Sequence, residues 1–189
     1  MEADFIPVEA SARHIHLSKA DLIKLFGETP ITKKKDLSQP GQYQCNERVK
    51  LIGPKGVING VAILGPSRDK TQVEISMTDA FALGLKPPIR DSGELSGSEA
   101  IFIAGDEGVI LSPESVIIAK RHIHMTDIDA EHFKVRDGDL VKVKIFSQRP
   151  VIFEDVLIRV KKSYKLAMHI DLDEANAVGY TPETFCSIV

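Results

Sequence analysis

The stretch Ala12–Ser18 reads ARHIHLS and the stretch Lys120–Thr126 reads KRHIHMT, so one pattern occurs twice in a chain of 189 residues with only six histidines. Alternate residues of a β-strand point to the same side of a sheet, so the two histidines of each copy face together. An apolar residue and a hydroxyl residue able to cap a helix follow each pair. The repeat predicts a strand that presents two side chains and then turns into a capped helix.

Short strands are predicted for most of the remaining chain. Apolar and β-branched runs such as RVKLIGP, GVINGVAILGP and DLVKVKIF are separated by Gly, Pro, Asn and Asp residues. So many short strands, in a chain with 43% hydrophobic residues, favour barrels. Short helices are predicted after Ser18, Thr78, Thr126 and Asp173, and three of them run into a glycine near the expected end. We expect a mainly β fold in which these helices close the barrel ends.

The composition excludes several classes of protein. The net charge of -3, from 24 basic and 27 acidic residues, gives no broad field for nucleic acid or an anionic membrane. No run approaches the ~20 apolar residues of a membrane span, and the opening MEADFIPVEASARH has no signal-peptide core. The two cysteines, Cys45 and Cys186, form no CxxC motif. We expect a cytoplasmic protein that binds neither nucleic acid nor a membrane.

The paired histidines predict metal sites. Zinc binds histidine nitrogen, and a catalytic zinc commonly has three protein ligands and one open position, so each pair needs a further ligand. Glu74 lies in EISMTDAFALG, a partial echo of the repeat in which Glu74 and Ser76 take the histidine places. His169 lies in an apolar strand that ends in acidic residues. We assign Glu74 and His169 as the third ligands, and His132 to the solvated face of a helix.

Simpler interpretations exist for each of these residues. A single His-x-His strand is more often an exposed face than a metal site, but two near-identical copies in a histidine-poor chain reverse that expectation. An exposed strand carboxylate would explain Glu74 alone, and ordinary salt bridges explain Arg13 and Arg121. Arg68, in the turn-forming LGPSRDKTQ, presents a guanidinium that suits phosphate, with a plain surface arginine as the alternative. The basic cluster at residues 33–35 is interpreted as a solvated loop.

Several longer stretches carry a family resemblance. They are PVEASARHIHLS, LSQPGQY, ILGPSRDKTQVEIS, IIAKRHIHMT and MHIDLDEANA, and the resemblance extends from about Pro7 to Ala177. Together they resemble the PduL family of phosphate acyltransferases, the phosphotransacylases associated with bacterial microcompartments. The resemblance implies two intertwined small β-barrels capped by short α-helices. The expected division is residues 1–13 plus 120–189 in one barrel, residues 14–26 plus 47–119 in the other, and residues 27–46 as a loop or small hairpin insertion.

The resemblance also implies an activity and its residues. That family exchanges a short acyl group, acetyl or propionyl, reversibly between coenzyme A and inorganic phosphate, and it uses two zinc ions. One ion would be held by His14, His16 and Glu74, and the other by His122, His124 and His169. Arg68 would bind phosphate or acyl phosphate. The coenzyme A site would be lined by Ser11, Lys35, Leu64 and Asn176.

One position departs from the family pattern. Many relatives read VRVLGP where this chain reads VAILGP, so Ala62 stands in the place of an arginine associated with the active site. Either a lysine of the 33–35 cluster compensates, or the affinity for the anionic substrate is weaker. We expect direct transfer without an acyl-enzyme, because neither cysteine is near a histidine motif. The two ions are expected side by side at one cleft.

Other functions and locations stay open at this level. A zinc-dependent thioester or phosphoester hydrolase would use the same ligands, and a non-catalytic microcompartment component would use the histidines structurally. Relatives inside microcompartments, as in propanediol degradation, carry an N-terminal amphipathic helix that MEADFI does not show. The chain is therefore expected in the cytoplasm or, with a targeting peptide lost, in a microcompartment lumen. A homodimer is the default expectation for a small enzyme.

Overall fold

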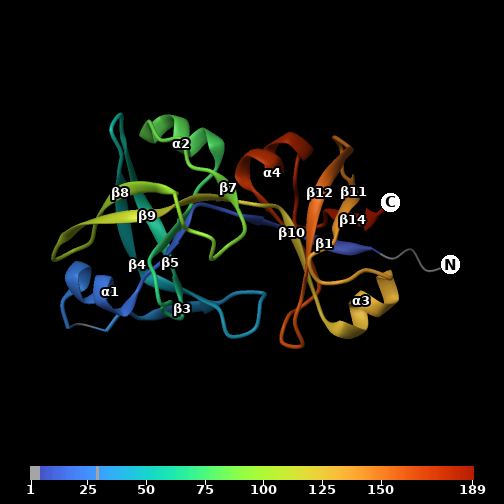
Figure 1. The fold of residues 1–189 in the computed structure, drawn as a ribbon, viewed down its shortest axis with the longest axis horizontal. Helices are drawn as coiled ribbons and strands as arrows, with labels where there is room; N and C mark the ends of the chain where they lie inside the picture. The colour runs from blue at the N-terminus through green and yellow to red at the C-terminus, as the bar shows by residue number, and fades with distance from the viewer. Residues whose placement is uncertain (1–4, 29) are drawn as a thin grey trace. The chain divides into compact units, whose positions relative to one another are not determined.

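The structure, a computed structural model, describes residues 5–28 and 30–189. Residues 1–4, which belong to the MEADFI stretch, lie outside the described residues, as does residue 29. The chain divides into two compact units (Figure 1). The unit Ala12–Ala119 is called the first barrel below. The unit that combines the segment ending at Ser11 with Lys120–Val189 is called the second barrel.

The first barrel closes through six strands in the order β4-β5-β2-β6-β9-β8 among the described residues. These strands are β2 (His14–His16), β4 (Tyr43–Ile52), β5 (Val57–Gly65), β6 (Gln72–Glu74), β8 (Glu99–Ala104) and β9 (Val109–Ala119). Two short strands extend the sheet, with β3 (Lys33–Asp36) on β4 and β7 (Ile89–Arg90) on β9. The basic cluster at residues 33–35 therefore lies on an exposed edge strand of a hairpin.

The second barrel closes in the order β1-β13-β10-β12-β11-β14. Its strands are β1 (Ile6–Ser11), β10 (His122–Met125), β11 (Leu140–Phe146), β12 (Val151–Val160), β13 (Ala167–Asp171) and β14 (Phe185–Ile188). Its apolar core includes Ile123, Met125, Met168 and Ile170 from the strands that also carry histidines. Each barrel therefore has a core of its own.

The two barrels share one topology. The His-x-His strands β2 and β10 each pair parallel to one neighbour, β5 or β12, and antiparallel to the other, β6 or β13. Strand β1 leads into β2 but pairs with β13 of the second barrel, while β9 leads into β10 but pairs with β6 of the first. The chain thus passes from one barrel to the other twice, between β1 and β2 and between β9 and β10. The prediction of a mainly β fold with two intertwined barrels is confirmed.

Core packing decides which way the histidines point. Ile15, between His14 and His16, is fully buried in the core of the first barrel, and Ile123 is equally buried in the second. Burying an isoleucine side chain contributes about 2 kcal/mol, and a one-residue slip of the strand would expose it. Because side chains alternate along a strand, the flanking histidines point to the outer face of each barrel.

Four short helices follow the ligand-bearing strands within the described residues. They are α1 (Lys19–Phe26), α2 (Met77–Leu83), α3 (Asp127–Phe133) and α4 (Leu172–Val178). As predicted, Ser18 and Thr126 cap α1 and α3, and glycines end α1, α2 and α4. In this part of the chain, no helix has the length and apolar character needed to cross a membrane.

The caps predicted at Thr78 and Asp173 are wrong by two residues. The Ser76 hydroxyl accepts from the backbone N–H of Asp79, whose carboxylate accepts from the Ser76 N–H in return. Asp171 makes the same reciprocal pair of bonds and caps α4. These capping boxes satisfy two free backbone donors at once, whereas Thr78 and Asp173 lie inside the first turn. Ser76 is therefore a helix cap and no counterpart of a histidine.

Candidate metal centres

The first centre consists of His14, His16 and Glu74. One possible ligand atom from each residue lies within 4.8 Å of the other two. His14 on β2 is directly opposite Glu74 on the antiparallel strand β6, and its Nε2 atom lies 3.5 Å from Glu74 Oε2. Both histidines are almost fully buried. The structure thus brings one imidazole pair together with one of the two predicted third ligands.

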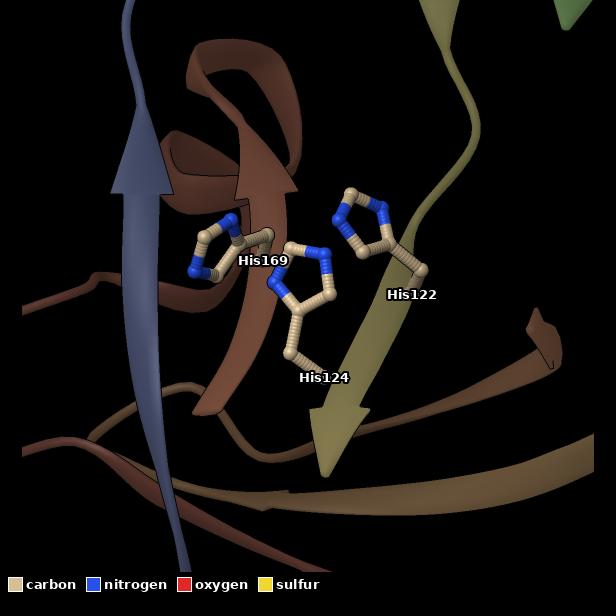
Figure 2. A group of neighbouring side chains, drawn as sticks. All are labelled: His122, His124 and His169. Carbon is tan, nitrogen blue, oxygen red and sulfur yellow. The ribbon is translucent and has the colours of Figure 1, made fainter. Parts of the chain in front are cut away.

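The second centre consists of His122, His124 and His169 (Figure 2). His122 on β10 is directly opposite His169 on the antiparallel strand β13, as His14 is opposite Glu74. Their possible ligand atoms also lie within 4.8 Å of one another, and the centroids of the His124 and His169 rings are 4.8 Å apart. Both centres are therefore built on the same pair of strands.

Backbone carbonyl groups orient the first histidine of each pair. The Nδ1 atom of His14 lies 2.8 Å from the Ala12 carbonyl oxygen, and that of His122 lies 2.8 Å from the Lys120 carbonyl oxygen. Because a carbonyl oxygen only accepts, Nδ1 carries a proton, so Nε2 is the atom that offers a lone pair when the ring is neutral. Metal-bound histidines commonly donate their other ring N–H in this way. Nitrogen and carboxylate donors so arranged fit a divalent ion such as zinc.

Burial and neighbouring charges set the protonation of the first centre. Burial, with the charges of His14 and Arg68 nearby, lowers the pKa of His16 to about 3. For His14, burial lowers the pKa, but the Glu74 carboxylate outweighs burial and the pKa is raised. For Glu74, burial raises the pKa, but His14, His16 and Arg68 together hold it well below its ordinary value. An ionised Glu74 and a neutral His16 are the states that a metal ligand requires.

Two residues that the sequence reasoning missed hold Glu74 in place. Its Oε1 atom accepts from the Gln72 side-chain amide at 2.5 Å and from the Ser92 hydroxyl at 3.1 Å. Gln72 is 1% exposed, and its side-chain Oε1 atom accepts from the backbone N–H of Gly93. These bonds leave Oε2 directed to His14. The period of two along β6 could have indicated Gln72, but Ser92 follows β7 and has no local signal.

Arg68 lies beside the first centre. Its Nη2 group donates to His16 Nε2 at 2.8 Å, and its Nη1 group donates to the Ser92 hydroxyl at 3.0 Å. Arg68 and His16 share an open pocket of about 350 Å³, which is also lined by residues 40–42 and 65–66. A guanidinium next to a candidate metal ligand in an accessible pocket is suited to bind an anion.

The four residues expected at the coenzyme A site fall into two pairs. Lys35 on β3 and Leu64 on β5 lie on either side of Gln44 in β4, so they belong to one sheet of the first barrel. In the second barrel, Ser11 at the end of β1 is opposite Asp171, the cap of α4, and α4 carries Asn176. Lys35 is exposed.

The predicted salt bridges of the two arginines are confirmed. Arg13 donates to Asp79 through Nε at 2.9 Å and pairs with it through Nη2 at 2.8 Å. Arg121 donates to Glu174 through Nη1 at 2.9 Å. Each arginine precedes a His-x-His strand, and each acid lies in the first turn of the helix after the third-ligand strand. The two ion pairs therefore tie the ligand-bearing segments of each centre together.

Ala62 lies next to the first centre, whereas His132 belongs to neither centre. Ala62 on β5 is in register with His14 on one side and with Arg48 of β4 on the other. The Arg48 guanidinium donates to the Cys45 carbonyl oxygen at 3.0 Å. His132 is exposed on α3, as predicted, and contributes to neither group of ligands.

Comparison with known proteins gives a consistent result. The family model described as phosphate propanoyltransferase matches residues 7–181, which include all six candidate ligands. A phosphate propanoyltransferase of Alkaliphilus metalliredigens is 60% identical over 180 residues, covering 95% of this chain and 85% of the relative. One of Clostridioides difficile is 55% identical over 186 residues, covering 98% and 89%. One of Thermotoga maritima is 55% identical over 174 residues, covering 91% and 83%.

Proposed function

The chain belongs to the phosphate propanoyltransferase family and is a phosphate acyltransferase, and we propose that it moves an acetyl or propionyl group reversibly between coenzyme A and phosphate with two bound zinc ions. The contact between Arg68 and His16 carries the proposal. It joins an anion-binding side chain to a candidate metal ligand at 2.8 Å, inside an open pocket. A phosphate acyltransferase needs its phosphate held next to the groups that stabilise charge.

Each centre would hold one zinc ion, the first through His14, His16 and Glu74 and the second through His122, His124 and His169. The carbonyl-bound Nδ1 atoms, the buried donors and the ionised carboxylate support this assignment. When bound, zinc supplies positive charge that lowers the pKa of a nearby thiol and neutralises phosphate oxygens.

Arg68 would bind the phosphate group in both directions of the reaction. Toward acyl-CoA, the coenzyme A thiolate sulfur attacks the carbonyl carbon of the acyl phosphate, a C–S bond forms, and the C–O bond to phosphate breaks. The thiol proton is released, and the departing phosphate keeps the bonding electron pair. The Arg68 guanidinium, held by Ser92 through Nη1, stabilises the negative charge that grows on this leaving group.

Direct transfer agrees with the environment of both cysteines. Cys45 and Cys186 are fully buried. Burial raises the pKa of Cys186 to about 12, and burial together with Glu47 raises the pKa of Cys45. A thiol must lose its proton to act as a nucleophile, so neither side chain is suited to carry an acyl group.

Lys35, Leu64, Ser11 and Asn176 would contact coenzyme A. The exposed Lys35 ammonium suits the phosphate groups of the cofactor. The protein would act in the cytoplasm or in a microcompartment lumen, and the family name is consistent with either location. A homodimer stays a prediction, which light scattering of the purified chain would test.

The test follows thioester formation from acetyl phosphate or propionyl phosphate and coenzyme A. We expect acyl-CoA to form, the rate to be lost after treatment with a chelator, and zinc to restore it. Arg68→Ala should reduce the rate strongly. Cleavage of acyl phosphate without coenzyme A would instead indicate the hydrolase, and an unchanged rate after complete metal removal would rule out a catalytic role for zinc.

A further inference from the structure

Each centre lies on a row of residues that crosses three neighbouring strands. In the first barrel the row crosses β2, β6 and β9, and it contains His14, Glu74 and Ile117. The carboxylate is on the middle strand, where it can be a ligand itself. The third position is a fully buried isoleucine.

The corresponding row of the second barrel crosses β10, β13 and β1, and it contains His122, His169 and Glu9. Here the middle strand carries an imidazole, and the carboxylate is on the third strand. Each row therefore has one carboxylate, but in the second barrel it stands one strand farther from the His-x-His pair. The buried Ile117 shows that the shared topology does not itself require an acid at the third position.

Glu9 and His169 are in direct contact. The Nε2 atom of His169 lies 3.1 Å from Glu9 Oε2, within ion-pair distance although the N–H does not point straight at the oxygen. Figure 2 shows one ring nitrogen of His169 turned toward β1, the blue strand that carries Glu9. A carboxylate only accepts, so the proton belongs on Nε2 and the lone pair on Nδ1.

We infer that Glu9 is a positioning residue of the second centre, which holds His169 with its proton on Nε2 and so presents Nδ1 to a divalent ion. The inference rests on the proposed binding of metal at this centre. Three neutral imidazoles carry no charge to balance a divalent ion, and Glu9 supplies through His169 the negative charge that Glu74 supplies directly in the first centre. Such carboxylate–histidine–metal arrangements commonly change metal affinity by about 10–100-fold.

The test uses the full chain with His14→Ala, so that only the second centre takes up zinc. Zinc affinity of the metal-stripped protein is measured by competition with a chromophoric chelator. Adding Glu9→Gln, which keeps the shape of the side chain and removes its charge, should weaken zinc binding by about 10–100-fold. Glu9→Asp keeps the charge and should give a smaller loss. Circular dichroism of each variant checks that the fold is retained.

Glu154→Gln is the matched control. It removes an exposed carboxylate of the same barrel that pairs with Lys142, and it should leave the zinc affinity unchanged. Equal zinc affinity with Glu9 and with Glu9→Gln would overturn this inference and leave the proposed function standing. A His14→Ala protein that takes up no zinc would overturn both.

A second measurement needs no substitution at Glu9. Long-range ¹H–¹⁵N spectra of the zinc-loaded chain report which ring nitrogen of each histidine carries the proton. A proton on Nε2 of His169 supports the inference, and a proton on Nδ1 overturns it.

Discussion

The two barrels present the same strands and capped helices but surround the second histidine of each pair differently. In the first barrel, the Arg68 guanidinium donates to His16. In the second, the ring of Tyr164 packs on His124 with centroids 4.2 Å apart. The first centre is thus next to a guanidinium group, whereas the second is partly covered by an aromatic ring.

The loops that cause this difference begin in the same way. The Arg68 N–H donates to the Leu17 carbonyl oxygen at 3.0 Å, and the Lys161 N–H donates to the Met125 carbonyl oxygen at 3.1 Å. Leu17 and Met125 each directly follow a His-x-His pair. The backbone therefore offers one equivalent position beside each centre, occupied by Arg68 at the first and by Lys161 at the second.

Removing either centre should have the largest effect. His16→Ala and His124→Ala should each lose one equivalent of zinc and lower kcat on the order of 10³-fold, because a metal contributes several kcal/mol of charge stabilisation. Metal analysis and initial rates check this. His132→Ala, on an exposed face of α3, is the control and should change neither quantity. If one of the two variants keeps the full rate, catalysis needs only the other centre.

Alanine substitution of the two equivalent loop residues, Arg68 and Lys161, should have the next largest effect on the reaction rate. Arg68→Ala should lower kcat/KM for phosphate by about 10²-fold, since charged hydrogen bonds contribute about 1.5–3 kcal/mol each. Lys161→Ala should change it less than about twofold, because the Lys161 ammonium lies over the Tyr164 ring, 5.9 Å from its centroid. Equal losses in the two variants would contradict the assignment of phosphate to the first centre.

Zinc binding at the first centre should depend on pH through His14. Zinc must displace the His14 proton, and because Glu74 raises the pKa of His14, competition begins above the ordinary histidine pKa of about 6.5. Affinity should be highest above the raised pKa and fall about tenfold per pH unit below it. Chelator competition in a His122→Ala chain measures the profile. Glu74→Gln should move its midpoint to lower pH, and an unmoved midpoint would show that Glu74 does not set the pKa.

Local patterns in the sequence were sufficient to predict the ligands of both centres and the direction in which the histidines point. The alternation of His14, Ile15 and His16 predicts two imidazoles on one face and an apolar residue in the core, and Ile15 is fully buried. The third ligands also follow from a pattern. Aligned by their true caps, Glu74 and His169 each lie two residues before a capping residue, as His16 and His124 do. Placing the cap at Thr78 put the alignment of Glu74 with the histidines two residues out of register.

Contacts between strands that are distant in the sequence could not be predicted in this way. Glu9 reaches His169 because β1 pairs with β13, and Ser92 reaches Glu74 because the chain after β7 returns to β6. No local period encodes which strands pair, since that choice depends on packing of the whole barrel. The supporting residues of both centres were therefore missed, although the ligands themselves carry a repeated signal.

Loss of the ion pairs Arg13–Asp79 and Arg121–Glu174 should have the smallest effect, measured on the free energy of unfolding. Arg13 makes two bonds to Asp79, whose side chain is 6% exposed, whereas Arg121 makes one bond to Glu174, which is 21% exposed. Arg13→Ala leaves a buried carboxylate without its partner and should cost about 2 kcal/mol, while Arg121→Ala should cost about 1 kcal/mol. Burial and Asp171 raise the pKa of Glu174, so it also takes up a proton more easily when its partner is lost.

Double-mutant cycles separate these pair energies from the capping role of each acid. Asp79 and Glu174 both complete capping boxes, so replacing either acid alone also weakens a helix start. The cycle Arg13→Ala with Asp79→Ala cancels that common loss and leaves the coupling energy of the pair. Urea unfolding of the metal-stripped chain supplies the free energies, with each barrel followed separately if two transitions appear. A larger coupling for Arg121 and Glu174 would mean that the number of bonds and the burial of the acid do not decide how firmly each strand end is held.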